Sequence, residues 1–417
     1  MYVARGVAAS YLSPVPEPRP VAPLARTPED WAEAIRPLAG RPYHARQLFR
    51  WLQARGVVDV DRMTDLPKAL RAKLAALPFH RTAAAAHVRR SLDGTRKILI
   101  SLADGATETV LIPGVSGNRG VLPSPLEAVG DADVAAAEDD DETETDAEPG
   151  GANDGEDRGR DEGVRVTQCV STQVGCAMGC VFCASGVAGL KRQLGADEIV
   201  GQVIVGRAHL DAGERLSNVV FMGMGEPLHN YEATARALRL LMHPDGVALS
   251  ARRITVSTSG LVPEILRLGE EFGGNLGLAV SLHAADDETR SRLMPINKKY
   301  PLASLMDALR AYPLPRRRRI TIEYALVAGR NDSRDDARKL ARLLRGLPVK
   351  VNLIPMNPIA ASSLGPPDLR FVLEFQRLLC DAGYACFVRR RRGDDVDAAC
   401  GQLALLGAKP KVRVDRT

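Results

Sequence analysis

The strongest constraint on the fold is a regular alternation of β-like runs and helical patterns over the second half of the chain. Seven short apolar runs begin at Val166, and the last of them is ACFVRR at residues 385–390. Helical stretches separate them, such as VPEILRLGEEF (262–272) and SRDDARKLARLLRGL (333–347). This alternation is typical of an α/β fold with a parallel sheet. We therefore predict a partial (β/α)6 TIM-like barrel over residues 166–405, with its active site at the carboxyl ends of the strands.

The region before this barrel divides into segments of different composition. Residues 1–27 are Pro-rich and predict a disordered leader. Residues 28–80 show helical spacing of apolar residues, as in RPYHARQLFRWLQARG, and predict an N-terminal helical domain. In residues 81–113, two Asp-Gly dipeptides separate β-rich runs, which predicts a small β extension.

The net charge of +5 hides an acidic segment within a basic chain. Residues 131–162 hold 15 acidic residues against two arginines, a local charge of −13, so the rest of the chain carries about +18. We predict that residues 114–165 form an acidic disordered insertion and that residues 406–417 form a tail. A body this basic suggests a polyanionic partner such as RNA, although a solvated basic surface gives the same composition.

Other features bear on the cellular compartment. The sequence has no long apolar run of the kind that crosses a membrane, and its N-terminus lacks the compact apolar segment of a secretion signal. The seven cysteines are mostly clustered, which favours thiols or metal ligands over disulfides. We therefore expect a cytoplasmic protein that does not use a membrane.

Four of the cysteines fall within CVSTQVGCAMGCVFC, residues 169–183. Cys176, Cys180 and Cys183 have the spacing C-x3-C-x2-C, and Cys169 lies upstream of them. Iron–sulfur clusters take thiolates at such steps, whereas structural zinc sites prefer four protein ligands. The motif therefore favours a cluster with three protein ligands and one iron open to a substrate. The alternatives are a zinc loop completed by Cys169 or His229, or buried core thiols.

This motif resembles the signature of the radical SAM enzymes, and the wider sequence resembles the RlmN family among them. The resemblance runs from about residue 29 to residue 405. It rests on CVSTQVGCAMGCVFCASG, VVFMGMGEPLHN, RRITVSTSGLVP, LAVSLHAADDETRSRLMPINKKY, ITIEYALVAGRND, VNLIPMNP and VRRRRGDDVDAACGQLA. It implies an adenosine C2-methyltransferase that acts on 23S rRNA and on tRNA. The acidic insertion, which joins Glu108 to Cys169, is not part of the family's pattern and could compete with RNA phosphate.

The resemblance also implies cofactors and partners. One [4Fe–4S] cluster on Cys176, Cys180 and Cys183 would bind S-adenosyl-L-methionine (SAM), of which two molecules serve each turnover. An electron donor such as flavodoxin or ferredoxin would reduce the cluster, and the enzyme would be a monomer. The residues that match the family's SAM-binding positions are Gly225, Glu226, Ser257, Ser281, Leu282, His283 and Asn357.

Three further residues match catalytic positions of the family. Cys400, in DDVDAACGQLA, would accept a methyl group that is then joined to the base. Cys169 would attack the sulfur of Cys400 and release the RNA through a transient disulfide, which is ordinary thiol exchange. Glu108, in ATETVLIP, would be the general base, so the small β extension must lean over the barrel. Without the resemblance, Cys400 is a small packing residue and Glu108 an exposed strand residue.

The remaining assignments are less specific. Cys380 and Cys386 fit core positions, and residues 316–319 and 389–392, all arginines, are candidate phosphate contacts or solvated charge. The helical domain could grip folded RNA by shape through Arg41, His44, Arg46, Arg50 and Trp51. Two rival functions stay open: a C8-methylating paralogue of the chloramphenicol–florfenicol resistance type, and a zinc-stabilised RNA-binding protein without catalysis. We favour C2, because the helical domain and RGDDVDAACGQLA resemble the C2-methylating branch more closely.

Overall fold

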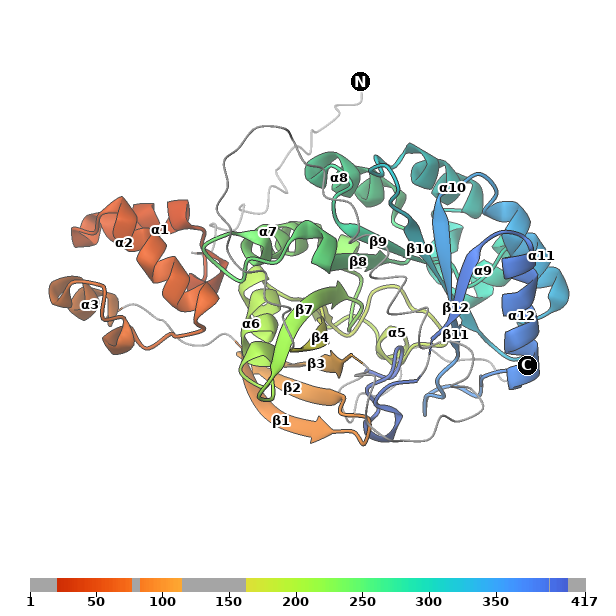
Figure 1. Ribbon diagram of the computed structural model, residues 1–417, viewed down its shortest axis with the longest axis horizontal. Coiled ribbons are helices and arrows are strands. Elements are labelled where there is room, and N and C mark those ends of the chain that lie inside the picture. Colours follow the sequence, from red (N-terminus) through yellow and green to blue (C-terminus); the bar gives the residue numbers. More distant parts are fainter. Residues whose placement is uncertain (1–20, 77–82, 115–162, 390, 404–417) are drawn as a thin grey trace, which may run out of the picture.

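The computed structural model describes residues 21–76, 83–114, 163–389 and 391–403 (Figure 1). Most of the predicted leader, most of the acidic insertion and the whole predicted tail lie outside these residues, so those predictions stay untested. In the described part of the chain, none of the helices combines the length and the apolar surface that a membrane span needs.

The N-terminal helical unit packs on one side of the molecule (Figure 1). Thr27 begins its first long helix with a capping box, in which the Thr27 hydroxyl accepts from the Asp30 N–H and the Asp30 carboxylate accepts from the Thr27 N–H. Trp31, Phe49 and Leu52 are fully buried in its interior. The elements are η1 (Pro23–Ala25), α1 (Pro28–Ile35), η2 (Arg36–Leu38), α2 (Pro42–Phe49), the π-turn η3 (Arg50–Ala54), η4 (Val60–Arg62) and α3 (Lys68–Leu74).

The structure differs from the predicted leader at η1. Leu24 and Ala25 are buried, and this turn packs against α6 (Ala196–Arg207). The side chain of Gln53 donates to the carbonyl of Leu24, and Arg236 donates to the carbonyl of Ala25. The last residues of the predicted disordered leader are therefore ordered, because Leu24 and Ala25 are buried when η1 packs against α6.

One ten-stranded sheet forms the centre of the molecule, in the order β1-β2-β3-β4-β7-β8-β9-β10-β11-β12. From β4 onward every neighbouring pair is parallel, and β12 is not bonded back to β1, so the barrel is open. This confirms the predicted α/β class and the partial barrel, to which β12 adds a further parallel strand. The barrel strands are β4 (Val164–Cys169), β7 (Glu214–Phe221), β8 (Ile254–Thr258), β9 (Gly277–Ser281), β10 (Ile320–Leu326), β11 (Val349–Pro355) and β12 (Ala385–Val388).

Helices cover the outside of the parallel strands (Figure 1). Their buried faces carry residues such as Leu238, Ile265 and Leu340, which join the large core cluster beneath the sheet. Besides α6 they are α7 (Tyr231–Met242), α8 (Val262–Phe272), α9 (Asp287–Leu293), α10 (Leu302–Ala311), α11 (Arg334–Leu343) and α12 (Leu369–Asp381). A small ribbon of β5 (Gln173–Val174) and β6 (Arg192–Gln193) and the short helix α5 (Ala184–Ala188) flank the cysteine motif.

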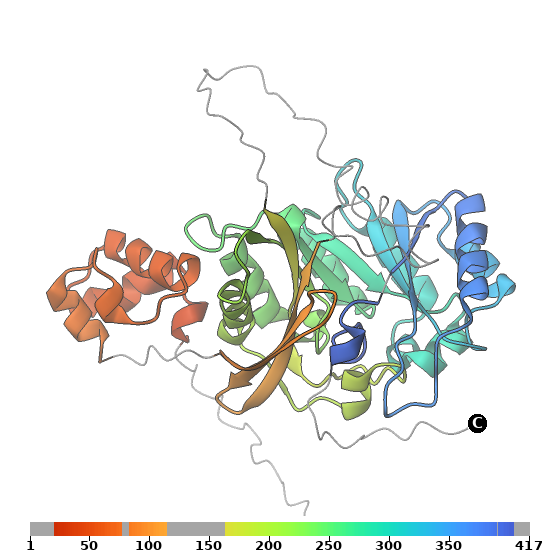
Figure 2. The ribbon, with the colours of Figure 1, turned by 60° about the horizontal axis from the view of Figure 1, so that its bottom comes forward.

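The predicted small β extension consists of β1 (Ala84–Arg90), β2 (Arg96–Leu102) and β3 (Gly105–Pro113). Instead of leaning over the barrel as a separate unit, it continues the barrel sheet, because β3 pairs antiparallel with β4 and places Val110 opposite Cys169. This pairing protects what would otherwise be an open edge of the barrel. Figure 2 shows the end of the described chain beside these strands, and the backbone N–H of Gly393 donates to Asp93 at 3.0 Å.

Candidate active site

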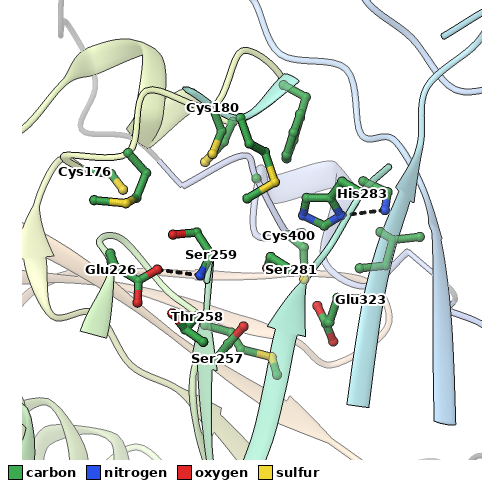
Figure 3. Close-up of a pocket in the computed structure, with 18 of the residues that line it drawn as sticks. Cys176, Cys180, Glu226, Ser257, Thr258, Ser259, Ser281, His283, Glu323 and Cys400 are labelled. Carbon is green, nitrogen blue, oxygen red and sulfur yellow. Dashed lines mark hydrogen bonds between the residues drawn. The ribbon is translucent and has the colours of Figure 1, made fainter. Parts of the chain in front are cut away.

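A cavity opens at the carboxyl ends of the barrel strands (Figure 3). Five neighbouring strands each contribute a side chain to its wall: Phe221, Ser257, Ser281, Glu323 and Ile354. The cysteine motif and the segment that carries Cys400 complete the wall. Because carboxyl ends of parallel strands meet at one edge, residues distant in sequence converge here, as the barrel prediction required.

The loop that carries the cysteine motif is tightly folded against α5. Gly175 has a φ of 79°, which favours glycine. A Cβ on Gly186 would lie 2.8 Å from the backbone nitrogen and oxygen of Cys180, so no side chain fits there. The fold of this loop places Cys176, Cys180 and Cys183 on the cavity wall together.

Ionisation of these three thiols is unfavourable unless a cation lies beside them, because they are buried and close to one another. Burial, and next a thiolate at Cys183, raise the pKa of Cys176 to about 12. Burial and both other thiolates hold the pKa of Cys180 well above its usual range. A metal centre supplies the positive charge that stabilises adjacent thiolates. The donor set therefore fits an iron–sulfur cluster.

The zinc alternative is less well supported. Among the described residues, no group of three or more His, Cys, Asp or Glu side chains converges closely enough to hold a single metal ion. Nδ1 of His229 lies 3.0 Å from the side-chain nitrogens of both Gln173 and Gln193, and Cys169 packs away from the motif. A cube of iron and sulfur separates its cysteine ligands more widely than one zinc ion does, so the arrangement suits the cluster better.

Glu226 presents a buried carboxylate at the cavity wall (Figure 3). Its Oε2 accepts from the N–H of Ser259 at 2.7 Å and its Oε1 accepts from the N–H of Leu228 at 3.1 Å. Burial raises the pKa of this carboxyl, and the hydrogen bonds oppose the shift. Next to it, Gly225 has a φ of 105°, and a Cβ there would lie 2.6 Å from the side chain of Gln173. Such a carboxylate suits a ligand's ammonium group.

Six of the seven predicted SAM-binding residues line the cavity, and Leu282 is the exception. Leu282 is fully buried, and its N–H donates to the carbonyl of Glu323 at 3.0 Å. At the wall, Oδ1 of Asn357 and Oγ of Ser259 are buried without a hydrogen-bond partner among the described residues. Buried polar atoms normally have partners, so these two indicate where a polar ligand such as SAM would bind.

His283 is held as a neutral ring. Its φ is 56°, and its Nδ1 accepts from the N–H of Ala325 at 2.9 Å. Burial lowers its pKa to about 3, with a contribution from Arg290. Since Nδ1 is an acceptor, the proton of the neutral ring lies on Nε2. The ring packs edge-on against Phe182, with centroids 4.8 Å apart, beside the cysteine motif.

The structure brings Cys400 and Cys169 to the same place. Cys400 lines the cavity, and Nδ2 of Asn357 donates to its carbonyl at 2.9 Å. Cys169 ends β4 and is buried in a small cluster with Val110 and with Ala398, two residues before Cys400. Burial raises the pKa of Cys169 to about 12, and a thiolate at Cys400 is the next cause. Burial also raises the pKa of Cys400, although the residue as a whole is solvent-exposed. All seven cysteines are free thiols in the structure.

Glu108 is buried, not exposed, and it does not line the cavity. Nζ of Lys97 lies 3.0 Å from its Oε1 and also donates to the carbonyl of Asp397 at 3.0 Å. In the sheet, Lys97 is opposite Val110, and Val110 is opposite Cys169. Glu108 is two residues before Val110 on the same strand, so its side chain lies on the same face as those of Lys97 and Cys169. Glu108 and Cys169 therefore lie on one face of the sheet, and Lys97 links Glu108 to the backbone of the segment that carries Cys400.

Some residues of the site were not found from the sequence. Glu323 lies beside Cys400 in Figure 3, and Nη1 of Arg389 reaches within 3.5 Å of its Oε1. A charged residue inside the apolar run RITIEYALV was the available signal for Glu323. Thr258, Met178 and Met294 also line the cavity, and their residue types carried no signal.

Several assignments outside the cavity need correction. Cys386 is buried as predicted, but Cys380 is exposed. His44 is buried, and its Nδ1 caps α2 by accepting from the N–H of Arg41, which gives this side chain a structural role. Arg50 pairs with Asp245.

Two family models match the chain: the Radical SAM superfamily over residues 170–344, and the Ribosomal RNA large subunit methyltransferase N-terminal domain over residues 29–78. A protein of Sorangium cellulosum (strain So ce56), named Dual-specificity RNA methyltransferase RlmN, is 64% identical over 94% of this chain and 98% of its own. The protein of that name from Anaeromyxobacter sp. (strain Fw109-5) is 43% identical over 94% and 93%. The chain belongs to the RlmN family. The crystal structure of a radical SAM methyltransferase from Sphaerobacter thermophilus is 41% identical, matches with a TM-score of 0.77, and covers 94% of this chain and 100% of its own.

Membership in the RlmN family confirms the family and the enzyme class that the sequence resemblance implied. The chain is a radical SAM RNA methyltransferase, with the RlmN-type N-terminal domain ahead of the barrel. The alternative of a non-catalytic RNA-binding protein is therefore wrong.

Proposed function

We propose that this enzyme methylates C2 of an adenosine in 23S rRNA and in tRNA, through a methyl group carried by Cys400. The observation that carries the proposal is that Cys400 lies on the wall that also holds the cysteine motif, while Cys169 is buried in a cluster with Ala398 and Leu403, which flank Cys400 in sequence. The relatives' name, dual-specificity RNA methyltransferase, supports two kinds of RNA substrate.

Cys176, Cys180 and Cys183 would hold one [4Fe–4S] cluster, and the cavity would hold SAM. The polar groups of the wall suit its methionyl end: Glu226 for the ammonium, and Asn357 with Ser259 for further hydrogen bonds. Together, cluster and SAM supply a methyl group and a hydrogen-abstracting carbon radical.

The chain's own residues carry the methyl group to the base. Cys400 first becomes S-methylcysteine, and loss of a hydrogen atom from that methyl group lets its carbon bond to C2. Glu108 accepts the proton from C2, and the cluster, when bound, would take up the one electron that the adduct must also lose. The Cys169 thiolate then bonds to the sulfur of Cys400, while the bond between that sulfur and the methylene carbon breaks. The electron pair stays on the carbon, which takes up a proton and becomes the new methyl group.

The resulting disulfide between Cys169 and Cys400 must be reduced before the next turnover. Cytoplasmic thiols would do this, which agrees with the compartment inferred from the cysteine content. We further propose that the enzyme works as a monomer with flavodoxin or ferredoxin as electron donor. The cysteines do not distinguish C2 from C8, so mass spectrometry of RNA from cells with and without this protein must identify the modified atom.

The two thiols give the proposal its test. Cys400→Ala removes the methyl carrier, so neither methylated RNA nor a protein–RNA crosslink should form. Cys169→Ala leaves Cys400 able to join the base but removes the thiol that breaks the bond. This variant should accumulate RNA attached at Cys400, seen as a band shift in denaturing gels that ribonuclease trims.

Cys380→Ala is the matched control, because Cys380 is exposed on α12 and outside the cavity. It should turn over normally without trapped RNA. Normal turnover by Cys169→Ala would refute the role given to Cys169, and methylation by Cys400→Ala would refute the whole route.

A further inference from the structure

Arg389 lies between the Cys400 thiol and Glu323 at the edge of the cavity. Its Nη1 is 4.0 Å from Sγ of Cys400 and 3.5 Å from Oε1 of Glu323. The Glu323 side chain is 8% exposed and that of Arg389 34%, so solvent screens this pair only in part. One guanidinium nitrogen thus faces a thiol and a carboxylate at once.

Both charged groups are fixed by the sheet. The N–H of Arg389 donates to the carbonyl of Leu353 at 2.8 Å, which continues the ladder beyond β12. Glu323 lies in the middle of β10, with Ser281 and Asn352 as its register partners, and Nδ2 of Asn352 is 3.5 Å from its Oε1. Groups held by backbone ladders need little reorganisation when charge develops beside them.

Arg389 and Glu323 act on both special thiols, and in opposite directions. Burial is the largest cause of the raised pKa of Cys400; Arg389 lowers that pKa and Glu323 raises it. At Cys169, burial and a thiolate at Cys400 raise the pKa, Arg389 lowers it, and Glu323 raises it. The effect of one guanidinium therefore reaches both sulfurs.

We propose that Arg389 is the positioning residue that makes the thiolates of Cys400 and Cys169 available in turn, with Glu323 holding its guanidinium beside Cys400. The inference rests on the proposed function, since it assigns a reason for two thiols to ionise. In the first step the Cys400 proton leaves to water, and the thiolate bonds to a sulfonium methyl group whose old S–C bond breaks to give a neutral thioether.

Methylation then prepares the second thiol. Once Cys400 is an uncharged thioether it no longer repels a thiolate at Cys169, and Arg389 is left to stabilise Cys169 alone. These charge interactions set the order of the two reactions. Cys169 ionises more readily only after Cys400 has been methylated, so release of the RNA follows methylation.

Other ionisable groups near these thiols do not supply the same control. Cys183 of the motif raises the pKa of Cys400, but a cluster would neutralise it. On β2 and β3, Lys97 and Glu108 form an ion pair with each other at 3.0 Å, so their opposite charges largely cancel at a distance.

The test measures thiol reactivity in the reconstituted full chain, without SAM or RNA. Alkylation by iodoacetamide is followed against pH, and the peptides with Cys400 and Cys169 are quantified by mass spectrometry. In Arg389→Met the apparent pKa of Cys400 should rise by roughly one unit. Its alkylation rate below that pKa should fall only about threefold, because a more basic thiolate is also more nucleophilic. The Cys169 rate at one alkaline pH should fall likewise.

Two further variants separate charge from structure. Glu323→Gln should shift the Cys400 profile the opposite way, to lower pH, and Arg389→Lys should restore most of the wild-type profile. Arg391→Met is the matched control: Arg391 pairs with Asp394 and donates to the carbonyl of Met356, so the same loop loses one charge away from the thiols. Both profiles should stay at their wild-type positions.

An unchanged profile in Arg389→Met would overturn the inference. So would a shift in the same direction for Glu323→Gln and Arg389→Met, because that result means only that the loop has loosened. Neither outcome bears on whether Cys400 carries a methyl group, which the RNA-trapping test decides on its own.

Discussion

The ion pair between Lys97 and Glu108 gives a sharp prediction about how the Cys400 segment is held. Their side chains are 10% and 5% exposed, and Nζ of Lys97 lies 3.0 Å from Oε1 of Glu108. The same Nζ donates to the carbonyl of Asp397, three residues before Cys400. One ammonium group therefore joins a buried carboxylate of β3 to the backbone of the segment that carries Cys400.

Lys97→Met leaves Glu108 buried without this partner. Breaking such a pair from one side typically costs about 3–5 kcal/mol, so we expect the free energy of unfolding to fall by roughly 4 kcal/mol. Glu108→Gln keeps a hydrogen-bonding partner for Lys97 and should cost about 1–3 kcal/mol. The double variant removes both charges, so its cost should be smaller than the sum of the single costs by at least about 2 kcal/mol.

Urea unfolding followed by circular dichroism gives the free energies of unfolding of the three variants. Hydrogen exchange of residues 391–403 reports how firmly the Lys97 hydrogen bond holds the segment that carries Cys400. Exchange there should rise in Lys97→Met. Arg310→Met is the control, because its partner Asp307 is 76% exposed and such surface pairs contribute under about 1 kcal/mol. A coupling energy below about 0.5 kcal/mol, or a Lys97→Met variant as stable as Arg310→Met, would refute this account of the pair.

Two further outcomes are expected. Anaerobic reconstitution should load about four irons per chain, and replacing the three motif cysteines with alanine should abolish iron binding; zinc without iron in the wild type would contradict the cluster. His283, with its pKa lowered to about 3, binds fewer protons folded than unfolded between that value and about 6.5, so it costs stability as pH falls through this window. His283→Asn keeps an acceptor for the Ala325 N–H and suits the positive φ, so between pH 7 and 5 it should lose about 2 kcal/mol less stability than wild type, and an equal loss would contradict the neutral ring.

The barrel could be predicted from the sequence because its signal is local. Each strand is a short apolar run and each helix has its own period, so VPEILRLGEEF was expected as a helix and forms α8 over the same residues. The motif cysteines, Glu226 and Asn357 could be placed for the same reason, since each follows such a run and strand ends converge.

The partners of the charged residues could not be predicted, because they depend on sheet register and on chain segments far apart in sequence. Nothing in ATETVLIP distinguishes a solvent-facing Glu108 from one paired with Lys97, until β3 is known to lie between β2 and β4. Arg389 belongs to a run of four arginines that suggested phosphate contacts, yet it faces Glu323.

The sheet register also shows where the acidic insertion is attached relative to the cavity. In sequence it joins Glu108 to Cys169, which suggested that it could compete with RNA at the site. In the structure it is rooted at Gly114 and Gly163, next to Pro113 at the end of β3 and Val164 at the start of β4. Cys169 is at the opposite, carboxyl end of β4, and five residues of strand span roughly 16 Å. Because β3 runs antiparallel to β4, the carboxyl end of β3 lies beside the start of β4, away from the cavity. Both attachment points, Gly114 and Gly163, therefore lie away from the thiols, although the insertion falls between Glu108 and Cys169 in sequence.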